Sequence, residues 1–189
     1  MTLSQLNNFF WNLITQILGL DPTLPQNQDK VRISWPTSGS PSWKITDDIC
    51  FLQINNQPDS ISKQFDTKYT VQSGYNLNET ISYTKVHRVD MVLYGPNSLD
   101  NSEIIKNSLY ASSIYRTLLQ QNKMAVVQDV NIPVRSPELF EGQWWERTNF
   151  SVLFNEFIKC CKATLYQKID LLQIDFTFKR TNLSTNIHL

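Results

Sequence analysis

The stretch from Thr80 to Tyr94, in which apolar and polar residues alternate, constrains the fold of this chain more than any other. Side chains two positions apart lie on one face of a β-strand, so this period of two predicts a single long strand. Gly95 and Pro96 follow at once and are typical of a turn, which places the end of the strand at Tyr94. One face of the strand is expected to carry Ile81, Tyr83, Lys85, His87, Val89, Met91 and Leu93. His87 is therefore expected to be a sheet residue and not a ligand.

Two segments have the three- and four-residue spacing of apolar residues that is typical of amphipathic helices. The first covers Leu3 to Leu20, and Gly19 is expected to stop it because glycine tolerates a positive φ. The second begins near Ser98 and continues to Gln121. Thr2 or Ser4 is the N-cap candidate of the first helix, and Ser98 or Asp100 is that of the second. The polar stretch from the first helix to Lys30 is predicted to be a connector.

The remaining patterns predict further strands over Val31–Trp35, Ile49–Ile54, Met124–Val127, Thr148–Cys160 and Ile169–Phe178. Residues 55–80 are polar and are expected to form a long excursion, with a protruding hairpin around Gly74 as one form of it. Sequential strands are expected to pair antiparallel, with both helices on one face of the sheet. The sequence therefore predicts an α+β fold with one two-layer domain over residues 1–178 and a polar tail over 179–189.

Composition narrows the class of function. Seventeen basic and seventeen acidic residues give a formal net charge of zero, which argues against a protein that grips phosphates along a basic patch. Charged residues make up 18% of the chain, below the roughly 25% of typical globular proteins, so Asn, Gln, Ser and Thr must supply much of the surface polarity. Such a surface suits contact with other subunits. The first twenty residues fit neither a signal peptide nor a membrane span.

Candidate chemical groups are few. The five glycines lie at predicted element boundaries, so no glycine-rich phosphate-binding loop is present. The adjacent Asp47 and Asp48 are expected to point in opposite directions and to form a solvated turn. The three cysteines are expected to be reduced, small packing residues, and their spacing to histidine matches no zinc site. No catalytic, metal or cofactor site is predicted, and the chain is not expected to be an enzyme.

The adjacent Trp144 and Trp145 are the strongest candidates for a contact surface. Consecutive residues in an extended segment face opposite ways, so one indole is expected to enter the core while the other lies at the surface or in an interface. Packing of both rings within the protein itself is the alternative that stays open. The neighbouring Glu146 and Arg147 are expected to form an ion pair within or between subunits.

Three stretches, in this order along residues 30 to 158, resemble the phage neck terminator family. They are Ile33-Ser34-Trp35-Pro36 with Pro41 and Trp43-Lys44-Ile45, then Leu93-Tyr94-Gly95-Pro96-Asn97-Ser98, then Pro137-Glu138-Leu139-Phe140 through Gly142-Gln143-Trp144-Trp145-Glu146-Arg147-Thr148. The resemblance implies a tail-terminator-like fold and a virion structural protein at the head-to-tail junction. It implies a homomeric ring, with sixfold symmetry as the family expectation, through which genomic DNA passes without sequence-specific binding.

The resemblance also implies partners and a location. The partners are further copies of the chain, the head-to-tail connector or adaptor proteins, and tail tube or sheath proteins, with assembly in the bacterial host cytoplasm and no membrane contact. Candidate structural or interface residues are Trp35, Pro36, Trp43, Gly95, Pro96, Asn97, Glu138, Phe140, Trp144, Trp145, Glu146 and Arg147. The alternatives are a tail-completion or head-closure adaptor, a small intracellular enzyme that depends on His87, and a nucleic-acid-binding module.

Overall fold

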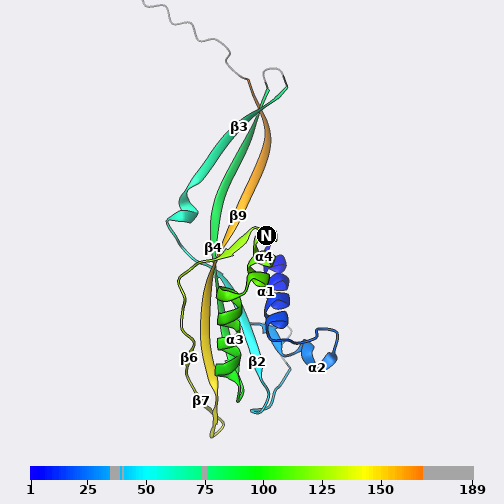
Figure 1. Ribbon diagram of the computed structural model, residues 1–189, viewed down its shortest axis with the longest axis vertical. Coiled ribbons are helices and arrows are strands. Elements are labelled where there is room, and N and C mark those ends of the chain that lie inside the picture. Colours follow the sequence, from blue (N-terminus) through cyan, green and yellow to red (C-terminus); the bar gives the residue numbers. More distant parts are fainter. Residues whose placement is uncertain (35–38, 40, 74–75, 168–189) are drawn as a thin grey trace, which may run out of the picture.

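A computed structural model gives the fold, and the structure describes residues 1–34, 39, 41–73 and 76–167. Trp35 and Pro36, the predicted strand Ile169–Phe178 and the predicted tail 179–189 lie outside the described residues. Within them the chain forms a single α+β domain in which helices cover one face of a mostly antiparallel sheet (Figure 1). The predicted fold class is confirmed.

Two long strands, β4 (Asn76–Tyr94) and β9 (Arg147–Gln167), form the spine of the sheet and pair antiparallel from Tyr94↔Arg147 to Asn76↔Gln167. The strand order is β1-β2-β4-β9-β5, while β3 pairs with β4 and β6 pairs with β9. The shorter strands are β1 (Val31–Ile33), β2 (Ile49–Asn56), β3 (Phe65–Ser73), β5 (Met124–Val126) and β6 (Val134–Arg135). A separate two-stranded hairpin consists of β7 (Glu138–Phe140) and β8 (Gln143–Trp145).

The expectation that sequential strands pair antiparallel is wrong for the first pair, because β1 and β2 run parallel, with Val31 opposite Cys50. Antiparallel neighbours are usually joined by a short hairpin turn, whereas a parallel pair requires a connection long enough to cross back. The connection between Ile33 and Ile49 is long enough for this crossing.

The first predicted helix is present as α1 (Leu3–Ile17), and Thr2 caps it in a capping box with Gln5. Gly19 follows with φ of 66°, as its predicted role as a stop requires. The connector after it contains one short helix, α2 (Pro25–Gln28). No helix in the described part of the chain is long and apolar enough to cross a membrane.

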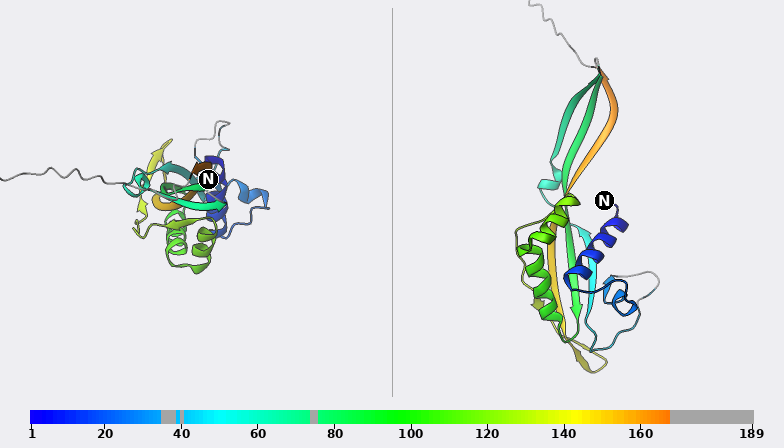
Figure 2. Two further views of the ribbon diagram at one scale, coloured as in Figure 1. Left: turned by 90° about the horizontal axis from the view of Figure 1, so that it is seen from above. Right: turned by 45° about the vertical axis from the view of Figure 1, so that its right-hand side comes forward.

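The second predicted helix is two helices, α3 (Ser98–Ala111) and α4 (Ser113–Gln121). Ser112 separates them with an extended ψ of 127°. Serine hydrogen-bonds to nearby backbone in non-helical conformations, so the Ser112-Ser113 pair is a weak point in an otherwise helical pattern. The break changes the expected number of helices but leaves them on one face of the sheet (Figure 2).

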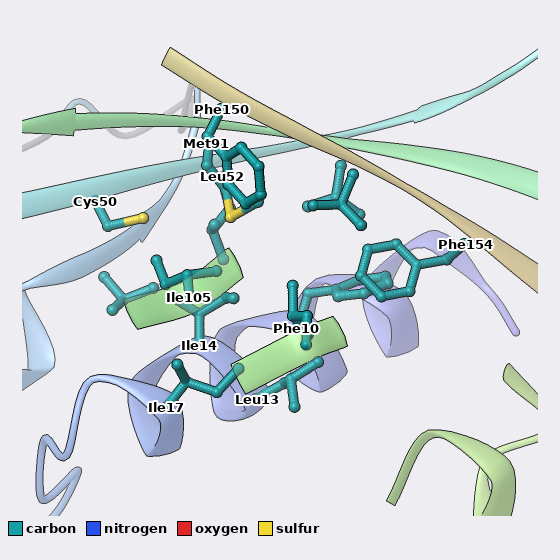
Figure 3. Close-up of a cluster of buried hydrophobic side chains, with 14 of the residues drawn as sticks. Phe10, Leu13, Ile14, Ile17, Cys50, Leu52, Met91, Ile105, Phe150 and Phe154 are labelled. Carbon is teal, nitrogen blue, oxygen red and sulfur yellow. The ribbon is translucent and has the colours of Figure 1, made fainter. Parts of the chain in front are cut away.

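The core lies between that face and the helices. Register pairs Leu52 with Met91 and Met91 with Phe150, and these residues face the buried side of α1 together with Ile105 of α3 (Figure 3). Burying each such side chain stabilises the fold by roughly 1.5–3 kcal/mol. The indole Nε1 of Trp11 donates to the carbonyl of Val31 at 2.8 Å, which fixes α1 to the edge strand β1.

Beyond the helices, β3 and the adjoining parts of β4 and β9 extend as a three-stranded arm (Figures 1 and 2). Segment 55–80 thus contains the end of β2, a short 3-10 helix (Ile61–Lys63), β3 and the beginning of β4. Phe65, Tyr83 and Ile158 form a cross-strand row on the arm, where the rings of Phe65 and Tyr83 are 5.0 Å apart. The arm and the β7–β8 hairpin lie at opposite ends of the molecule.

Candidate functional site

An aromatic cluster lies on the helix-free face of the sheet, where β4 ends and β9 begins. It consists of Trp43, Phe51, Tyr94, Phe140 and Trp145, and we call it the aromatic corner. The centroid of Trp43 is 5.2 Å from that of Phe51, 5.8 Å from that of Tyr94 and 6.1 Å from that of Trp145. Such ring pairs contribute about 0.5–1.5 kcal/mol each beyond their area of contact. The corner therefore holds together segments that lie far apart in sequence.

Arg32 adds a cation to this corner. Its guanidinium carbon lies 5.4 Å from the ring centroid of Trp43 and 5.8 Å from that of Phe51. The same guanidinium donates to the carbonyl of Asp29 at 2.6 Å, and the residue is 9% exposed. A cation over an aromatic face is attracted by the ring quadrupole, so Arg32 fixes the loop that carries Trp43.

The β7–β8 hairpin closes the corner through a two-residue turn. Glu141 and Gly142 occupy the turn with φ of 50° and 77°, the double positive φ that type I′ hairpin turns require. Glu141 takes this conformation without being glycine, while Gly142 is the residue type that suits it. The turn fixes a register in which Leu139 is opposite Trp144 and Glu138 is opposite Trp145.

This register gives the hairpin two different faces. Trp145 is half-buried against Phe140, with 6.1 Å between ring centroids, and belongs to the aromatic corner. Trp144 points the other way and is 68% exposed beside Leu139, which is 60% exposed. The two indoles therefore lie on opposite faces, but Trp145 enters the aromatic corner and not the main core between sheet and helices.

Glu146 and Arg147 do not pair with each other. Arg135 of β6 donates to Glu146 through Nε at 2.8 Å and also through a second guanidinium nitrogen, while Arg147 donates to Glu138 at 2.6 Å. The hydrogen bond from Arg135 lowers the pKa of the Glu146 carboxyl. Both pairs join the hairpin to its neighbours, and each leaves its charges neutralised within the chain.

Gly95, Pro96 and Asn97 form the turn beside this corner, and Asp48 holds it. The carboxylate of Asp48 accepts from the backbone amide of Asn97 at 3.0 Å and from its side-chain amide at 2.8 Å. The amide of Gly95 in turn donates to the carbonyl of Glu146 at 3.2 Å. Asp48, expected only as a solvated turn residue, thus fixes the start of α3.

A pocket of about 270 Å³ opens in the aromatic corner. It is lined by Ser42, Trp43, Tyr94, Glu138, Phe140 and Trp145. The Nε1 of Trp43 is buried and has no hydrogen-bond partner among the described residues. Burial raises the pKa of Tyr94, although the nearby Arg147 opposes this, and its hydroxyl lies 3.2 Å from the Glu138 carboxylate.

The predicted site residues therefore gather at one end of the molecule, apart from Trp35 and Pro36, which lie outside the described residues. Sequence reasoning missed Phe51, Tyr94 and Asp48 as members of this site. Tyr94 had a signal, because it is an aromatic residue on the polar side of the predicted strand, next to the Gly95 turn. Phe51 and Asp48 are joined to the site only by tertiary contacts.

His87 lies in the core as a sheet residue, away from the aromatic corner. It is fully buried, its Nε2 lies 2.7 Å from a Glu156 carboxylate oxygen, and its Nδ1 has no partner among the described residues. Burial would raise the pKa of Glu156, but hydrogen bonds from the Met1 amino group and from His87 hold it below its usual value. In the described part of the chain, no group of three or more His, Cys, Asp or Glu side chains is placed to hold a metal ion.

Cys50 and Cys160 differ from each other, and the side chain of Cys161 is not among those that the structure describes. Cys50 is buried in the core, and burial raises the pKa of its thiol to about 12, so it remains a protonated, unreactive side chain. Cys160 is exposed on β9, which corrects the expectation that it is a packing residue.

The fold and the site together define an α+β protein with an aromatic corner on the helix-free face of its sheet and a hairpin that exposes Trp144 and Leu139. A family comparison identifies the protein further: the family of the phage neck terminator protein matches residues 4–182, and the chain belongs to that family. It is thus a structural protein of the phage neck, a class that does not comprise enzymes. Membership implies a place in the virion and association with other head-to-tail proteins. No curated protein matches the chain.

Proposed function

We propose that this neck terminator assembles as a homomeric ring of six copies that terminates the tail, joins it to the head connector and lets the genome pass. The observation that carries this proposal is the β7–β8 hairpin, which exposes 68% of Trp144 and 60% of Leu139 next to each other. Large aromatic side chains are enriched at the centres of protein interfaces. A structural protein that exposes them at a rigid turn has the anchor that a subunit contact requires.

The charge of the chain supports passage of DNA. Seventeen basic residues balance seventeen acidic ones, and the ion pairs of Arg135 and Arg147 are closed within the chain. Binding to DNA depends mainly on unpaired cations that release counterions from phosphates. A ring of such copies would present a lumen that does not retain the genome, and a density map with a strongly basic lumen would contradict this part of the proposal.

The arm supports contacts with the other neck and tail proteins. It extends past the helical layer (Figure 1). Phe65, on the apolar row of the arm, is 61% exposed. A long sheet extension can reach a component that the body of the ring does not touch. The connector and the tail tube or sheath are the partners that we propose for it, with assembly in the bacterial host cytoplasm.

Trp144→Ala is expected to weaken ring assembly strongly while leaving the fold intact. An anchor residue at the centre of an interface contributes at least about 2 kcal/mol, which corresponds to roughly 30-fold weaker association per contact. Because Trp144 is mostly exposed in the single chain, the same change should alter the free energy of unfolding of the monomer by less than about 0.5 kcal/mol. Native mass spectrometry gives the number of copies, and urea unfolding gives the stability.

Trp145→Ala is the matched comparison, because this indole packs inside the chain. It should lower the stability of the single copy by about 1–3 kcal/mol through loss of its ring contacts. If both variants keep the oligomer of the unmodified protein and differ only in melting temperature, both indoles serve internal packing and the hairpin is not the subunit contact.

A further inference from the structure

The β7–β8 hairpin carries a protrusion on one face and one wall of the pocket on the other. Leu139 and Trp144 are opposite each other in register and form the exposed protrusion, which we call the knob. Glu138 and Trp145 lie on the other face and line the pocket of the aromatic corner. We propose that the knob of one copy inserts into this pocket of the next copy, so that a single hairpin supplies both halves of the junction. This inference rests on the proposed ring.

The pocket suits a protein side chain. Its volume of about 270 Å³ lies just below the range of roughly 300–1,000 Å³ typical of small-molecule sites. Aromatic rings from Trp43, Tyr94 and Trp145 form most of its wall, and such rings pack well against an indole or a leucine. The buried Nε1 of Trp43 lacks an acceptor among the described residues, and a backbone carbonyl of an inserted hairpin would supply one.

The charges around the junction permit an apolar contact. Arg147 is paired with Glu138 at the pocket, and Arg135 is paired with Glu146 on the strand next to the hairpin. Burying an unpaired charge in an interface costs several kcal/mol, whereas a pair that is already closed can stay at the rim. Neither the knob nor the pocket therefore presents an uncompensated charge to the neighbouring copy.

The knob is large enough to form the centre of the contact, but further surface around it must complete the interface. Trp144 and Leu139 are each more than half exposed and offer on the order of 300 Å² of apolar surface. A stable interface buries about 800 Å² per partner, so further surface must take part. The same sheet face continues from the pocket into a hollow of about 400 Å³ between Arg88 and Ile132, which no helix covers in the described part of the chain.

The knob and the pocket are different surfaces of one hairpin, and this restricts the symmetry of the contact between copies. A contact between two different surfaces of identical chains is head-to-tail, and its repetition gives a ring where the rotation closes and an open filament where it does not. A contact between identical surfaces would instead stop at a twofold dimer. A knob on one face of the hairpin and a pocket on the other therefore favour head-to-tail contacts, which are the kind of contact that the proposed ring requires.

A mixing experiment with two full-length variants tests the junction. Trp144→Ala removes the knob and leaves the pocket open, while Ser42→Trp fills the pocket from an exposed position and leaves the knob intact. Each variant alone should lose the ring. A one-to-one mixture should contain mixed dimers at least about tenfold above dimers of either variant, because only one intact junction can form per pair. Native mass spectrometry distinguishes the pairs by mass.

Thr46→Trp is the control, since it places the same side chain at an exposed position of the same loop outside the pocket lining. It should keep the ring of the unmodified protein. Rings that persist in Ser42→Trp, or mixtures with no excess of mixed dimers, would overturn the junction while the ring itself stands. An unmodified protein that stays a single copy even with its connector would instead overturn the proposed function.

A photo-reactive residue in place of Leu139 gives an independent readout. Illumination of the assembled protein should join it to the peptide of a second copy that contains Trp43. Cross-links that reach only the arm or the helices of a second copy would place the subunit contact elsewhere and overturn the junction.

Discussion

Gly95→Ala should be among the most damaging single substitutions in this protein, with an expected loss of about 3–5 kcal/mol in the free energy of unfolding. Gly95 has φ of 108°, a backbone conformation that residues with a Cβ rarely adopt. A Cβ at this position would lie 2.5 Å from Asp48 Oδ1, 2.6 Å from the Asp47 carbonyl oxygen and 2.8 Å from Asp48 Cα. Two of these three atoms belong to the backbone, so relief requires the whole turn to move.

Gly142→Ala separates the two causes of the loss expected for Gly95→Ala, which are the positive φ and the clash of the new Cβ. Gly142 also has a positive φ, of 77°, but no atom lies within 4 Å of the position that a Cβ would occupy, so only the backbone cost of about 1 kcal/mol applies. Urea unfolding of the two variants should therefore differ by at least about 2 kcal/mol. Equal losses would mean that Asp48 moves aside freely and does not hold the Gly95 turn.

The same turn illustrates what the sequence can predict. Alternation over Thr80–Tyr94 predicts β4, and the Gly95-Pro96 pair predicts its end, because both signals are local properties of the chain. The reason that position 95 requires glycine is not local, since the obstructing atoms belong to Asp47 and Asp48. The pairing of β2 with β4 and the hydrogen bonds from Asn97 to Asp48 bring the two segments together.

The direction of strand pairing also depends on distant residues. Val31–Ile33 has the pattern of a strand, but the pattern is the same whether its neighbour runs parallel or antiparallel. The break at Ser112 was not predicted for a different reason. The helical spacing of apolar residues continues through Ser112, but the helical conformation of the backbone does not. Periodicity reports which side is buried and says little about where one helix becomes two.

The sequence points to several residues of the aromatic corner but not to their geometry. Adjacent indoles in an extended segment must face opposite ways, and Trp144 and Trp145 do so. Which of them is exposed depends on the Glu141-Gly142 turn, which sets the register of the hairpin. The neighbours of Trp145 come from Trp43 and Phe140, whose approach cannot be read from spacing along the chain.

The two long strands β4 and β9 connect two different parts of the protein. At one end, β4 and β9 support the aromatic corner and its hairpin, and at the other they continue into the arm (Figure 1). Between these ends they carry the core, so any motion of one end relative to the other must bend a sheet that helices hold from one side. We expect this continuous, helix-covered part of the sheet to link the proposed hairpin and arm contacts rigidly.

Phe154→Ala tests whether that central part provides the rigidity, and it is expected to cost about 3–5 kcal/mol and to lower the melting temperature by on the order of 10 °C. Phe154 is 1% exposed and its ring centroid lies 4.8 Å from that of Phe10, which is fully buried. Removing the ring leaves a cavity between α1 and β9 that neighbouring side chains cannot fill without strain. Calorimetry and urea unfolding of the full chain measure both quantities.

Phe157→Ala is the matched control, because it removes the same side chain from the same strand where it is 49% exposed. Position 157 faces away from the helices, so its loss should cost less than about 1 kcal/mol. Since Phe154 is remote from the knob and the pocket, its variant should still form rings at temperatures where it is folded. If the Phe154→Ala variant loses the ring while each chain stays folded, packing between α1 and β9 positions the hairpin at the far end of the strand. Similar stability losses for both phenylalanines would contradict the assignment of the core to the helix-covered face.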